Sequence, residues 1–205
     1  MWKWILIACM AVSSAVSADV KVLAIAGSTR EASINKKLLV DAADIARKMG
    51  AEVTIINLND YPIPFFDEDL EADHGMPNKA KQLRRQMVQS NIILIASPEY
   101  NGSLPAVLKN VIDWASRGEN GGPSREAFQG KTFVIMSTSP GAGGGARGLS
   151  HLKTIIENVG GKVVEQQIAV PNGFTAFDSQ GHLKDPAMRA TLEKSIRSAF
   201  GTGVQ

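Results

Sequence analysis

The sequence predicts an α/β protein built on an open parallel sheet. Three short runs, 20–26, 91–97 and 131–137, are almost wholly apolar, as strands are when helices cover both faces of their sheet. Segments with apolar residues at helical spacing separate them, so strand and helix alternate along the chain. Right-handed crossovers then give a three-layer sandwich around a five-stranded parallel sheet of order 2-1-3-4-5. In that order the winding reverses between strands 1 and 3, and ligands bind beyond the carboxyl ends of the strands at such a point.

Glycine and proline separate the elements expected in the first half of the chain. These elements are a strand at 20–26, a helix from about 34 with its amphipathic part at 36–49, a strand at 52–58, an irregular segment at 59–67 and an acidic surface loop at 67–74. Gly50 supplies the stop of the helix. The two prolines of 59–67 exclude a regular element there.

The second half repeats the alternation. Its expected elements are a helix at 77–89, a strand at 91–97, a helix at 104–116, a glycine-rich connection at 118–130, a strand at 131–137, a helix at 149–158, a strand at 162–168, a loop at 171–186 and a helix at 187–200. The basic residues of the 77–89 helix, Lys79, Lys81, Arg84 and Arg85, are interpreted as a solvated face. The glycine-rich connection is interpreted as flexible and of the type that borders a site or a subunit contact.

Length and composition indicate one globular domain. The chain has 205 residues, of which 44% are hydrophobic and 20% charged. A chain of this size and composition can form a hydrophobic core that needs no disulfides or metal ions for stability. The net charge is only +2, and no basic block stands out. This balance argues against a surface that binds nucleic acid.

Residues 1–18 match a secretory signal sequence. Lys3 is their only charge, 5–12 is a continuous apolar run, and small residues precede Asp19. The run is shorter than the roughly 20 residues that span a bilayer, so membrane contact is expected only through an uncleaved segment. The domain is placed at 19–205. If the signal functions, we expect export to the periplasm or the medium. Cleavage would then remove Cys9, the only cysteine. If it does not function, we expect a cytoplasmic location.

The loop between the first strand and the first helix has the composition of a phosphate site. Hydroxyl groups come from Ser28, Thr29 and Ser33, and Arg30 adds a guanidinium group that can donate two parallel hydrogen bonds. The first N–H groups of the following helix lack partners within it. The same residues also suit an ordinary turn with a Ser33 cap and a solvated arginine. Taken alone, the loop leaves both interpretations open.

Two more unusual loops follow the third and fourth strands. One, at 98–103, carries Tyr100, and the other, at 138–148, is rich in glycine, which lets backbone approach a flat ligand closely. Parallel strands bring all three loops to one crevice, which favours a ligand site. No G-x-G-x-x-G follows the first strand, and no G-x-x-x-x-G-K-[ST] occurs. A site for one terminal phosphate beside two loops that bracket a flat group fits FMN.

Four motifs in order closely resemble the NADPH-dependent FMN reductase family, including its chromate- and quinone-reducing members. They are Gly-Ser-x-Arg-x-x-Ser-x-Asn at 27–35, Pro-Glu-Tyr-Asn-Gly-Ser at 98–103, Lys-Asn-x-Ile-Asp-Trp at 109–114 and Ser-Thr-Ser-Pro-Gly at 137–141 with the glycines that follow. The similarity spans about 21–200. The signal-like start is not part of the family pattern, and the 118–130 connection is variable, so nicotinamide and substrate contacts are not transferred there.

The resemblance implies a flavodoxin-like fold and an FMN site in the three loops. The residues it implies at the phosphate are Ser28, Arg30, Ser33, Ile34 and Asn35. Those it implies along the ribityl chain and the isoalloxazine ring are Pro98, Glu99, Tyr100, Asn101 and Gly102. Those it implies at the ring from the third loop are Ser137, Thr138, Ser139, Gly141 and Gly144. It also implies a homodimer or homotetramer, in which a neighbour's loop would cover the flavin.

Structural roles are expected for the other noticeable residues. Lys109 and Asp113, four apart on one helix, are expected to pair, and Trp114 is expected to pack in the core or at a subunit contact. Glu99 either orients a backbone donor or faces water. The histidines show no metal-ligand spacing and are expected at the surface: His74, His151 and His182. We predict no catalytic side chain and no metal site.

The predicted function is that of an oxidoreductase with FMN as cofactor and NADPH or NADH as electron donor. It would pass electrons to a small acceptor: a quinone, a flavin, an azo compound or a metal oxyanion such as chromate. The cofactor carries the chemistry, so no protein acid or base is needed. The alternative is a flavodoxin-like electron carrier without NAD(P)H oxidase chemistry. A carrier would be expected to show an acidic docking face, and a nearly neutral chain argues against it.

Overall fold

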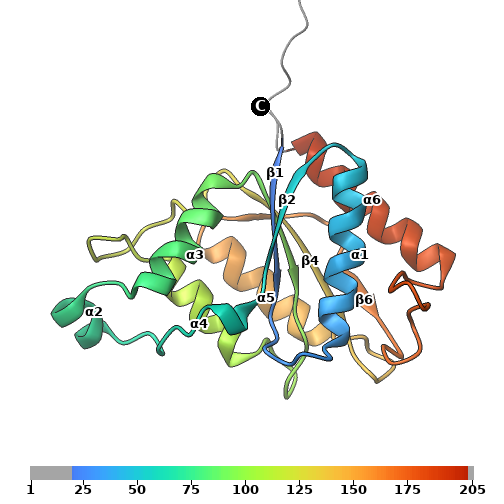
Figure 1. Ribbon diagram of the computed structural model, residues 1–205, viewed down its shortest axis with the longest axis horizontal. Helices are drawn as coiled ribbons and strands as arrows, with labels where there is room; N and C mark the ends of the chain where they lie inside the picture. The colour runs from blue at the N-terminus through green and yellow to red at the C-terminus, as the bar shows by residue number, and fades with distance from the viewer. Residues whose placement is uncertain (1–19, 203–205) are drawn as a thin grey trace, which may run out of the picture.

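The computed structural model describes residues 20–202, which fold around one parallel sheet covered by helices (Figure 1). The strands are β1 (Lys21–Ala26), β2 (Glu52–Ile56), β3 (Ile92–Ala96), β4 (Thr132–Thr138), β5 (Lys162–Val163) and β6 (Ile168–Val170). The helices are α1 (Ile34–Lys48), α2 (Glu68–His74), α3 (Asn78–Gln89), α4 (Ala106–Ala115), α5 (Ala146–Asn158) and α6 (Pro186–Thr202), with a short 3-10 turn, η1 (Leu58–Asp60). The predicted signal sequence lies outside the described residues.

The sheet has the predicted topology. Its order is β2-β1-β3-β4-β5, with β6 beside β4, and every pairing is parallel. This confirms the α/β class and the strand order expected from the sequence. Among residues 20–202, no helix combines the length and the apolar character needed to cross a bilayer.

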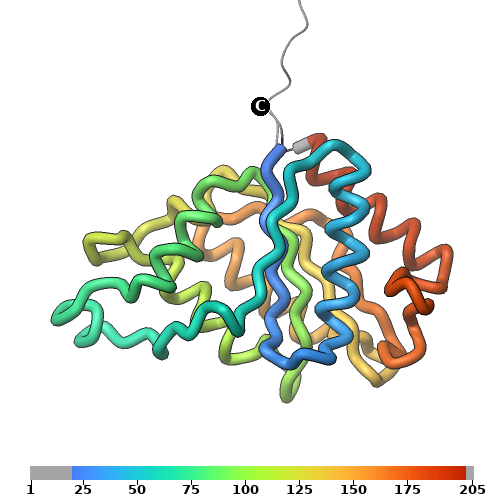
Figure 2. The backbone as a smooth tube through the Cα atoms, in the orientation of Figure 1, coloured from blue at the N-terminus to red at the C-terminus, as the bar shows by residue number. Residues whose placement is uncertain are grey.

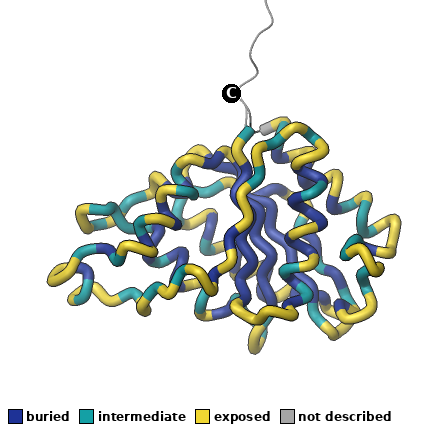
Figure 3. Tube along the Cα trace, viewed as in Figure 1, coloured by how far each residue is buried: buried dark blue, intermediate teal, exposed yellow. Residues whose placement is uncertain are grey.

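Two cores fill the space between the sheet and its helices. In β1, Val22, Ala24 and Ala26 face the layer of α1 and α6, whereas Leu23 and Ile25 face the layer of α3, α4 and α5. Successive strand residues point to opposite faces, so both faces of β1 are buried. Figure 1 shows the two helical layers on opposite sides, and Figure 3 shows the buried strands between them. This double burial explains why the central strands read as unbroken apolar runs.

The carboxyl ends of the parallel strands lie at one edge of the sheet, at the bottom of Figure 1. The loops after β1, β3 and β4 run along that edge, as the chain trace in Figure 2 shows. Two backbone hydrogen bonds continue the sheet pairing one residue past β1 and β3, so they fix where the loops after these strands begin. Gly27 N–H donates to Ala96 O over 2.8 Å, and Ser97 N–H donates to Met136 O over 2.8 Å. The edge is therefore the one at which the ligand site is predicted.

The predicted strand at 162–168 is interrupted, which corrects the sequence-based expectation of one continuous strand. β5 pairs with the start of β4 and β6 with its end. The polar residues 165–167 leave the ladder between them. The Ser195 hydroxyl of α6 donates to Gln166 O over 2.9 Å, so a carbonyl freed from the sheet finds another partner.

The prediction of a surface loop at 67–74 is wrong, because residues 68–74 form helix α2. Asp67 caps the helix, and its Oδ1 accepts from Asp69 N–H over 2.8 Å. Acidic side chains in the first turn suit the positive end of the helix dipole. Glu71 is buried in an ion pair. The acidic run therefore both starts a helix and packs it.

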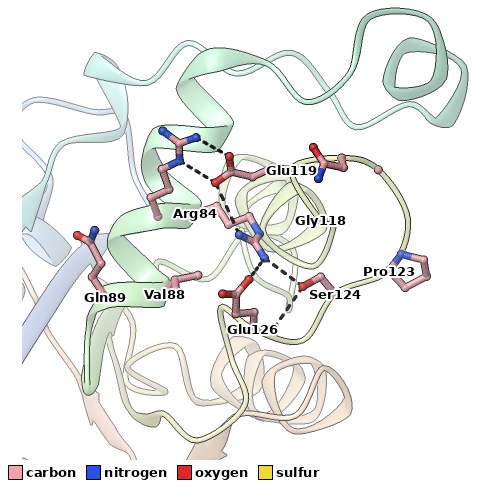
Figure 4. A pocket seen from close by; sticks show the side chains of 11 residues that line it. Arg84, Val88, Gln89, Gly118, Glu119, Pro123, Ser124 and Glu126 are labelled. Carbon is pink, nitrogen blue, oxygen red and sulfur yellow. Dashed lines mark hydrogen bonds and ion pairs between the residues drawn. The ribbon is translucent and has the colours of Figure 1, made fainter.

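Arg84 is buried, so the interpretation of the basic side of α3 as a solvated face is wrong at this position. Its side chain is 6% exposed. Its guanidinium donates to Arg117 O over 2.7 Å, to Ser124 Oγ over 3.0 Å and to Glu126 Oε2 over 2.6 Å. Figure 4 shows the last two contacts beside a cavity of about 650 Å³ between α3 and residues 118–126.

The glycine-rich connection is held against α3, away from the edge that carries the three loops. Gly118 N–H donates to Gly122 O over 2.8 Å and closes a turn. Arg85 pairs with Glu119, which lies in this turn. The connection therefore lies along α3 in a single copy of the chain, and its roles as a flexible border of a site or at a subunit contact stay predictions.

Replacing Arg84 with methionine is expected to lower the free energy of unfolding by about 2 kcal/mol. Methionine keeps much of the volume but leaves the part-buried Arg117 O without its donor, and an unsatisfied polar group away from solvent costs about 1–3 kcal/mol. Urea denaturation measures the difference. Arg85→Met is the matched control, because the Arg85 side chain is 62% exposed and exposed ion pairs contribute about 1 kcal/mol or less. Equal losses in the two variants would contradict the role given to Arg84.

Candidate functional site

The loop between β1 and α1 leads to an uncapped helix start. Ser33 occupies the N-cap position, but its hydroxyl forms no capping bond, so the alternative of an ordinary Ser33-capped turn is wrong. The N–H groups of Ile34 and Asn35, the first two helical residues, donate to no acceptor within residues 20–202. Free N–H groups at the positive end of a helix form a site for an anion.

Arg30 adds a cation beside this helix start. Its side chain is exposed, and none of the ion pairs in the described part of the chain uses its guanidinium. Its backbone N–H donates to the Ser28 hydroxyl over 3.3 Å. Ser28 and Ser33 are both buried. Hydroxyls, free helix N–H groups and an unpaired guanidinium together make a donor set suited to a phosphate monoester.

Asn35 joins this first loop to the end of β4. Its Nδ2 donates to Thr138 O over 2.9 Å, and its Oδ1 accepts from Thr138 N–H over 3.0 Å. Both residues are buried. The side-chain amide of Asn35 bonds to the N–H and the C=O of Thr138, as the backbone of a neighbouring strand would. Contact of Asn35 with a phosphate through its own free N–H stays a prediction, while its side chain holds the first and third loops together.

The second loop ends in a tight turn that presents Tyr100. Tyr100 N–H donates to Ser103 O over 2.9 Å, and Ser103 N–H donates to Tyr100 O over 3.1 Å. Asn101 and Gly102 between them have φ angles of 52° and 82°. Two positive φ angles define a type I′ turn, for which Asn-Gly is favoured. The turn leaves Tyr100 54% exposed, so its ring is available to a flat ligand.

The third loop has an open part and a packed part. A Cβ on Gly143 would meet nothing within 4 Å. Gly144 and Gly145 have φ angles of 60° and 90° and lie against protein. A Cβ on Gly144 would lie 2.7 Å from the carbonyl carbon of Ala169, and one on Gly145 would overlap the Ser137 hydroxyl. Glycine at 144 and 145 is therefore required by packing, whatever the ligand.

Protein encloses the hydroxyl groups of Ser137 and Thr138, two residues predicted at the ring. Thr138 Oγ1 donates to Val170 O over 3.0 Å. Ser137 is fully buried, and its hydroxyl has no partner among the described residues. Residues 140–143 are the exposed part of this loop. Those residues, with Ser139 at their start, are the ones open to a ligand.

A fourth segment, at 172–174, joins the site and was not predicted. Gly173 N–H donates to Ser139 O over 2.9 Å. A Cβ on Gly173 would lie 2.5 Å from both Ile34 Cδ1 and Thr138 Oγ1, so the segment packs tightly between the first and third loops. The Asn-Gly pair in it signals a turn, but nothing in the sequence indicates which loops the turn contacts.

Comparison with known proteins gives the family. The family model for NADPH-dependent FMN reductase matches residues 20–175. The chain belongs to this family. It is 33% identical over 183 residues to an NAD(P)H-dependent FMN reductase of Pseudomonas aeruginosa, an alignment that covers 89% of this chain and 94% of the relative. It is 31% identical over 188 residues to an NADPH:quinone oxidoreductase of Arabidopsis thaliana, with 90% and 92% covered.

A solved structure agrees with this assignment. The flavoenzyme NAD(P)H:(acceptor) oxidoreductase from Paracoccus denitrificans matches with a TM-score of 0.76 at 27% identity, covering 89% of this chain and 96% of that one. The flavodoxin-like fold and the cofactors FMN and NAD(P)H are thus confirmed for this member of the FMN reductase family. The described residues fit the flavin, because the free start of α1 and Arg30 suit its phosphate and the open loops suit its flat ring. Individual contacts stay predictions.

In this family member, Glu99 orients a backbone donor, which settles the alternative that the sequence left open. Its Oε2 accepts from Gly148 N–H over 3.1 Å, and its Oε1 accepts from Arg147 Nη2 over 2.6 Å. The hydrogen bond from Arg147 lowers the pKa of the Glu99 carboxyl below its ordinary value. The carboxylate is therefore ionised at neutral pH.

The motif on α4 has the structural role that the sequence suggested. Lys109 Nζ and Asp113 Oδ1 pair over 2.7 Å, as predicted. Trp114 is buried, as expected, and its Nε1–H donates to Pro64 O over 2.9 Å. Asn110 is buried beside it, and its Oδ1 accepts a backbone N–H of the same proline-containing connection over 2.8 Å. The motif therefore fastens the segment after β2 onto α4.

The histidines differ in their exposure. His74 and His151 are exposed, as predicted, whereas His182 is partly buried. His151 Nδ1 lies 3.1 Å from Ser103 Oγ, beside the second loop. No group of three or more His, Cys, Asp or Glu side chains in residues 20–202 could hold a metal ion.

Proposed function

We propose that this chain oxidises NAD(P)H and passes the electrons, through FMN, to a small acceptor: a quinone, a flavin, an azo compound or a metal oxyanion such as chromate. The observation that carries the proposal is the pairing of a free anion site at the start of α1 with an exposed ring site at Tyr100 and 140–143. Such an edge holds a cofactor by its phosphate and leaves room for varied small substrates. The names of the two relatives, an FMN reductase and a quinone oxidoreductase, support the acceptor class.

The chain's own residues bind and orient in this reaction. When bound, FMN supplies the electron-transfer chemistry. The start of α1 and Arg30 neutralise the phosphate, and the second and third loops bracket the ring. Glu99 is held by Arg147 and Gly148 in its ionised form. It therefore does not serve as a proton donor at neutral pH, and the proposal needs no catalytic side chain.

An electron carrier is the alternative, and flavin reduction by NADPH separates the two functions. Full bleaching of the flavin absorbance is expected when the FMN-loaded protein is mixed with excess NADPH in a stopped-flow instrument without oxygen. Free FMN at the same concentration is the control for reaction without the protein. Absorbance that stays unchanged, or that stops halfway to full reduction, would overturn the reductase proposal. The net charge of +2 also lacks the acidic excess that a carrier's docking face would need.

Assembly and location complete the proposal and depend on the sequence alone. We propose a homodimer or homotetramer, as the family resemblance implies. We propose export to the periplasm or the medium if residues 1–18 function as a signal, with the protein cytoplasmic otherwise.

A further inference from the structure

Helix α5 begins without a capping side chain of its own. Its N-cap residue is Gly145, at a φ of 90°, and its first turn contains no acidic residue. The first N–H groups of a helix need acceptors, and the positive end of its dipole favours negative charge. Arg147, the second helical residue, adds more positive charge. Ala146 N–H already donates to Gly143 O over 3.0 Å, so a negatively charged acceptor from elsewhere in the fold would favour the N–H groups that follow it.

Glu99, in the loop after β3, supplies that acceptor. Its Oε2 accepts from Gly148 N–H over 3.1 Å, and its Oε1 accepts from Arg147 Nε over 3.0 Å and Nη2 over 2.6 Å. The Glu99 side chain is 11% exposed and that of Arg147 is 79% exposed, so the carboxylate is the enclosed end of the pair. A Cβ on Gly148 would lie 3.4 Å from the Glu99 side chain and 3.2 Å from Ser103 O. The glycine thus lets the second loop lie directly on α5.

This contact joins two segments that line the predicted ring site. Glu99 directly precedes Tyr100, whose turn is exposed at the edge. A Cβ on Gly145 would lie 3.6 Å from Glu99 Cβ, so the third loop ends against the same side chain. Within residues 20–202, a further side-chain contact between these regions joins His151 to Ser103, and it is exposed. Glu99 is therefore the enclosed side-chain contact between the second loop and the start of α5, where the third loop ends.

We propose that Glu99 is a positioning residue for the flavin ring, which sets the gap between residues 98–103 and 139–145 by capping α5 from outside the helix. The inference rests on the proposed function, because it takes these two loops as the walls of the ring site. Its action would pass through the Tyr100 turn and the third-loop backbone. A helix cap with no role at the ring would stabilise the fold and leave flavin affinity unchanged.

Riboflavin is the probe that separates these two roles, because it has the ring but no phosphate. Glu99→Ala removes both contacts and is expected to weaken binding of riboflavin and of FMN to the full-length apoprotein to the same extent. The expected loss is about tenfold, or about 1.4 kcal/mol, because Glu99 acts through the position of the loops and not by a bond to the ring. Glu99→Gln keeps an acceptor for Gly148 N–H but loses the charge, so its affinity should lie between those of the wild type and Glu99→Ala. Fluorescence titration gives the dissociation constants.

Glu119→Ala is the matched control. Glu119 accepts from Arg85 Nε over 2.7 Å and from Arg85 Nη2 over 2.5 Å, which is the same chemistry beside α3. It should leave both flavin affinities unchanged. Wild-type riboflavin affinity in Glu99→Ala, with a change in thermal stability alone, would overturn the proposal. Should the alanine variant fail to fold, Glu99→Gln decides: weaker riboflavin binding supports positioning, and wild-type affinity overturns it.

The outcome stays distinguishable from a failure of the proposed function. Riboflavin affinity is measured without NADPH, so it tests the position of the loops directly. If the wild-type flavin is bound but not bleached by NADPH, the reductase proposal fails and the affinities still decide the role of Glu99.

Discussion

Replacing Gly145 with alanine is expected to destabilise the folded protein by about 3 kcal/mol or more, from backbone strain and overpacking together. The φ angle of 90° at this position is one that residues with a Cβ rarely adopt. The new methyl group would also overlap the Ser137 hydroxyl and lie 2.9 Å from Ser137 Cβ. Ser137 is fully buried, so its hydroxyl cannot turn outward into solvent. Urea denaturation of the apoprotein, followed by circular dichroism, measures the loss.

Gly143→Ala is the control for this substitution. It lies in the same loop, and its Cβ would meet nothing within 4 Å, so a change of about 0.5 kcal/mol or less is expected. Ser137→Ala in the Gly145→Ala background should restore part of the stability, because it removes the overlapping oxygen and leaves the backbone strain. Equal stability of the two single glycine variants would contradict the packing assigned to Gly145.

The sheet could be predicted because a strand that is buried on both faces has a continuous run of apolar residues in the sequence. Every residue from Val22 to Ala26 is apolar, and each lies in one of the two cores. The signal fails where a strand is short and half-exposed, so the interruption at 165–167 was missed. It also fails where polar residues pack, because burial of a charge depends on partners distant in sequence. Arg84 is buried because Arg117 O, Ser124 and Glu126, all more than 30 residues away in sequence, accept its hydrogen bonds.

The sequence could predict that the three loops share one edge of the sheet, but not which of their polar side chains the protein itself uses. Parallel strands bring the loops that follow them to one edge, so chain order alone puts the loops of Arg30 and Tyr100 at the same edge of the sheet. Tertiary structure decides which polar groups form hydrogen bonds or contacts within the protein and are then not available to a ligand. The Asn35 amide binds the backbone of Thr138, and Ser137 lies beneath Gly145. The same motif therefore encodes packing between loops as well as contact with a ligand.

Arg30→Ala is expected to weaken FMN binding by about 1.5–3 kcal/mol, the contribution of a hydrogen bond to a charged group. This corresponds to a dissociation constant roughly 10 to 150 times higher. The effect should be large because Arg30 has no carboxylate partner within residues 20–202, so its guanidinium reaches the phosphate without first breaking an ion pair. Quenching of flavin fluorescence during titration with apoprotein gives the constant.

Riboflavin and a neighbouring lysine show whether the loss comes from the phosphate contact. Riboflavin carries no phosphate, so Arg30→Ala should leave its affinity within about twofold of the wild type, as expected for a charge that it does not contact. Lys37 is exposed on the first turn of α1, and Lys37→Ala removes the same unit of charge without a phosphate contact. If Lys37→Ala weakens FMN binding as much as Arg30→Ala does, the phosphate is held by the overall positive potential at the start of α1 and not by a specific contact with Arg30. If riboflavin is weakened equally, Arg30 acts on the shape of the loop. A loss confined to FMN and to Arg30 is the result that a direct grip on the phosphate requires.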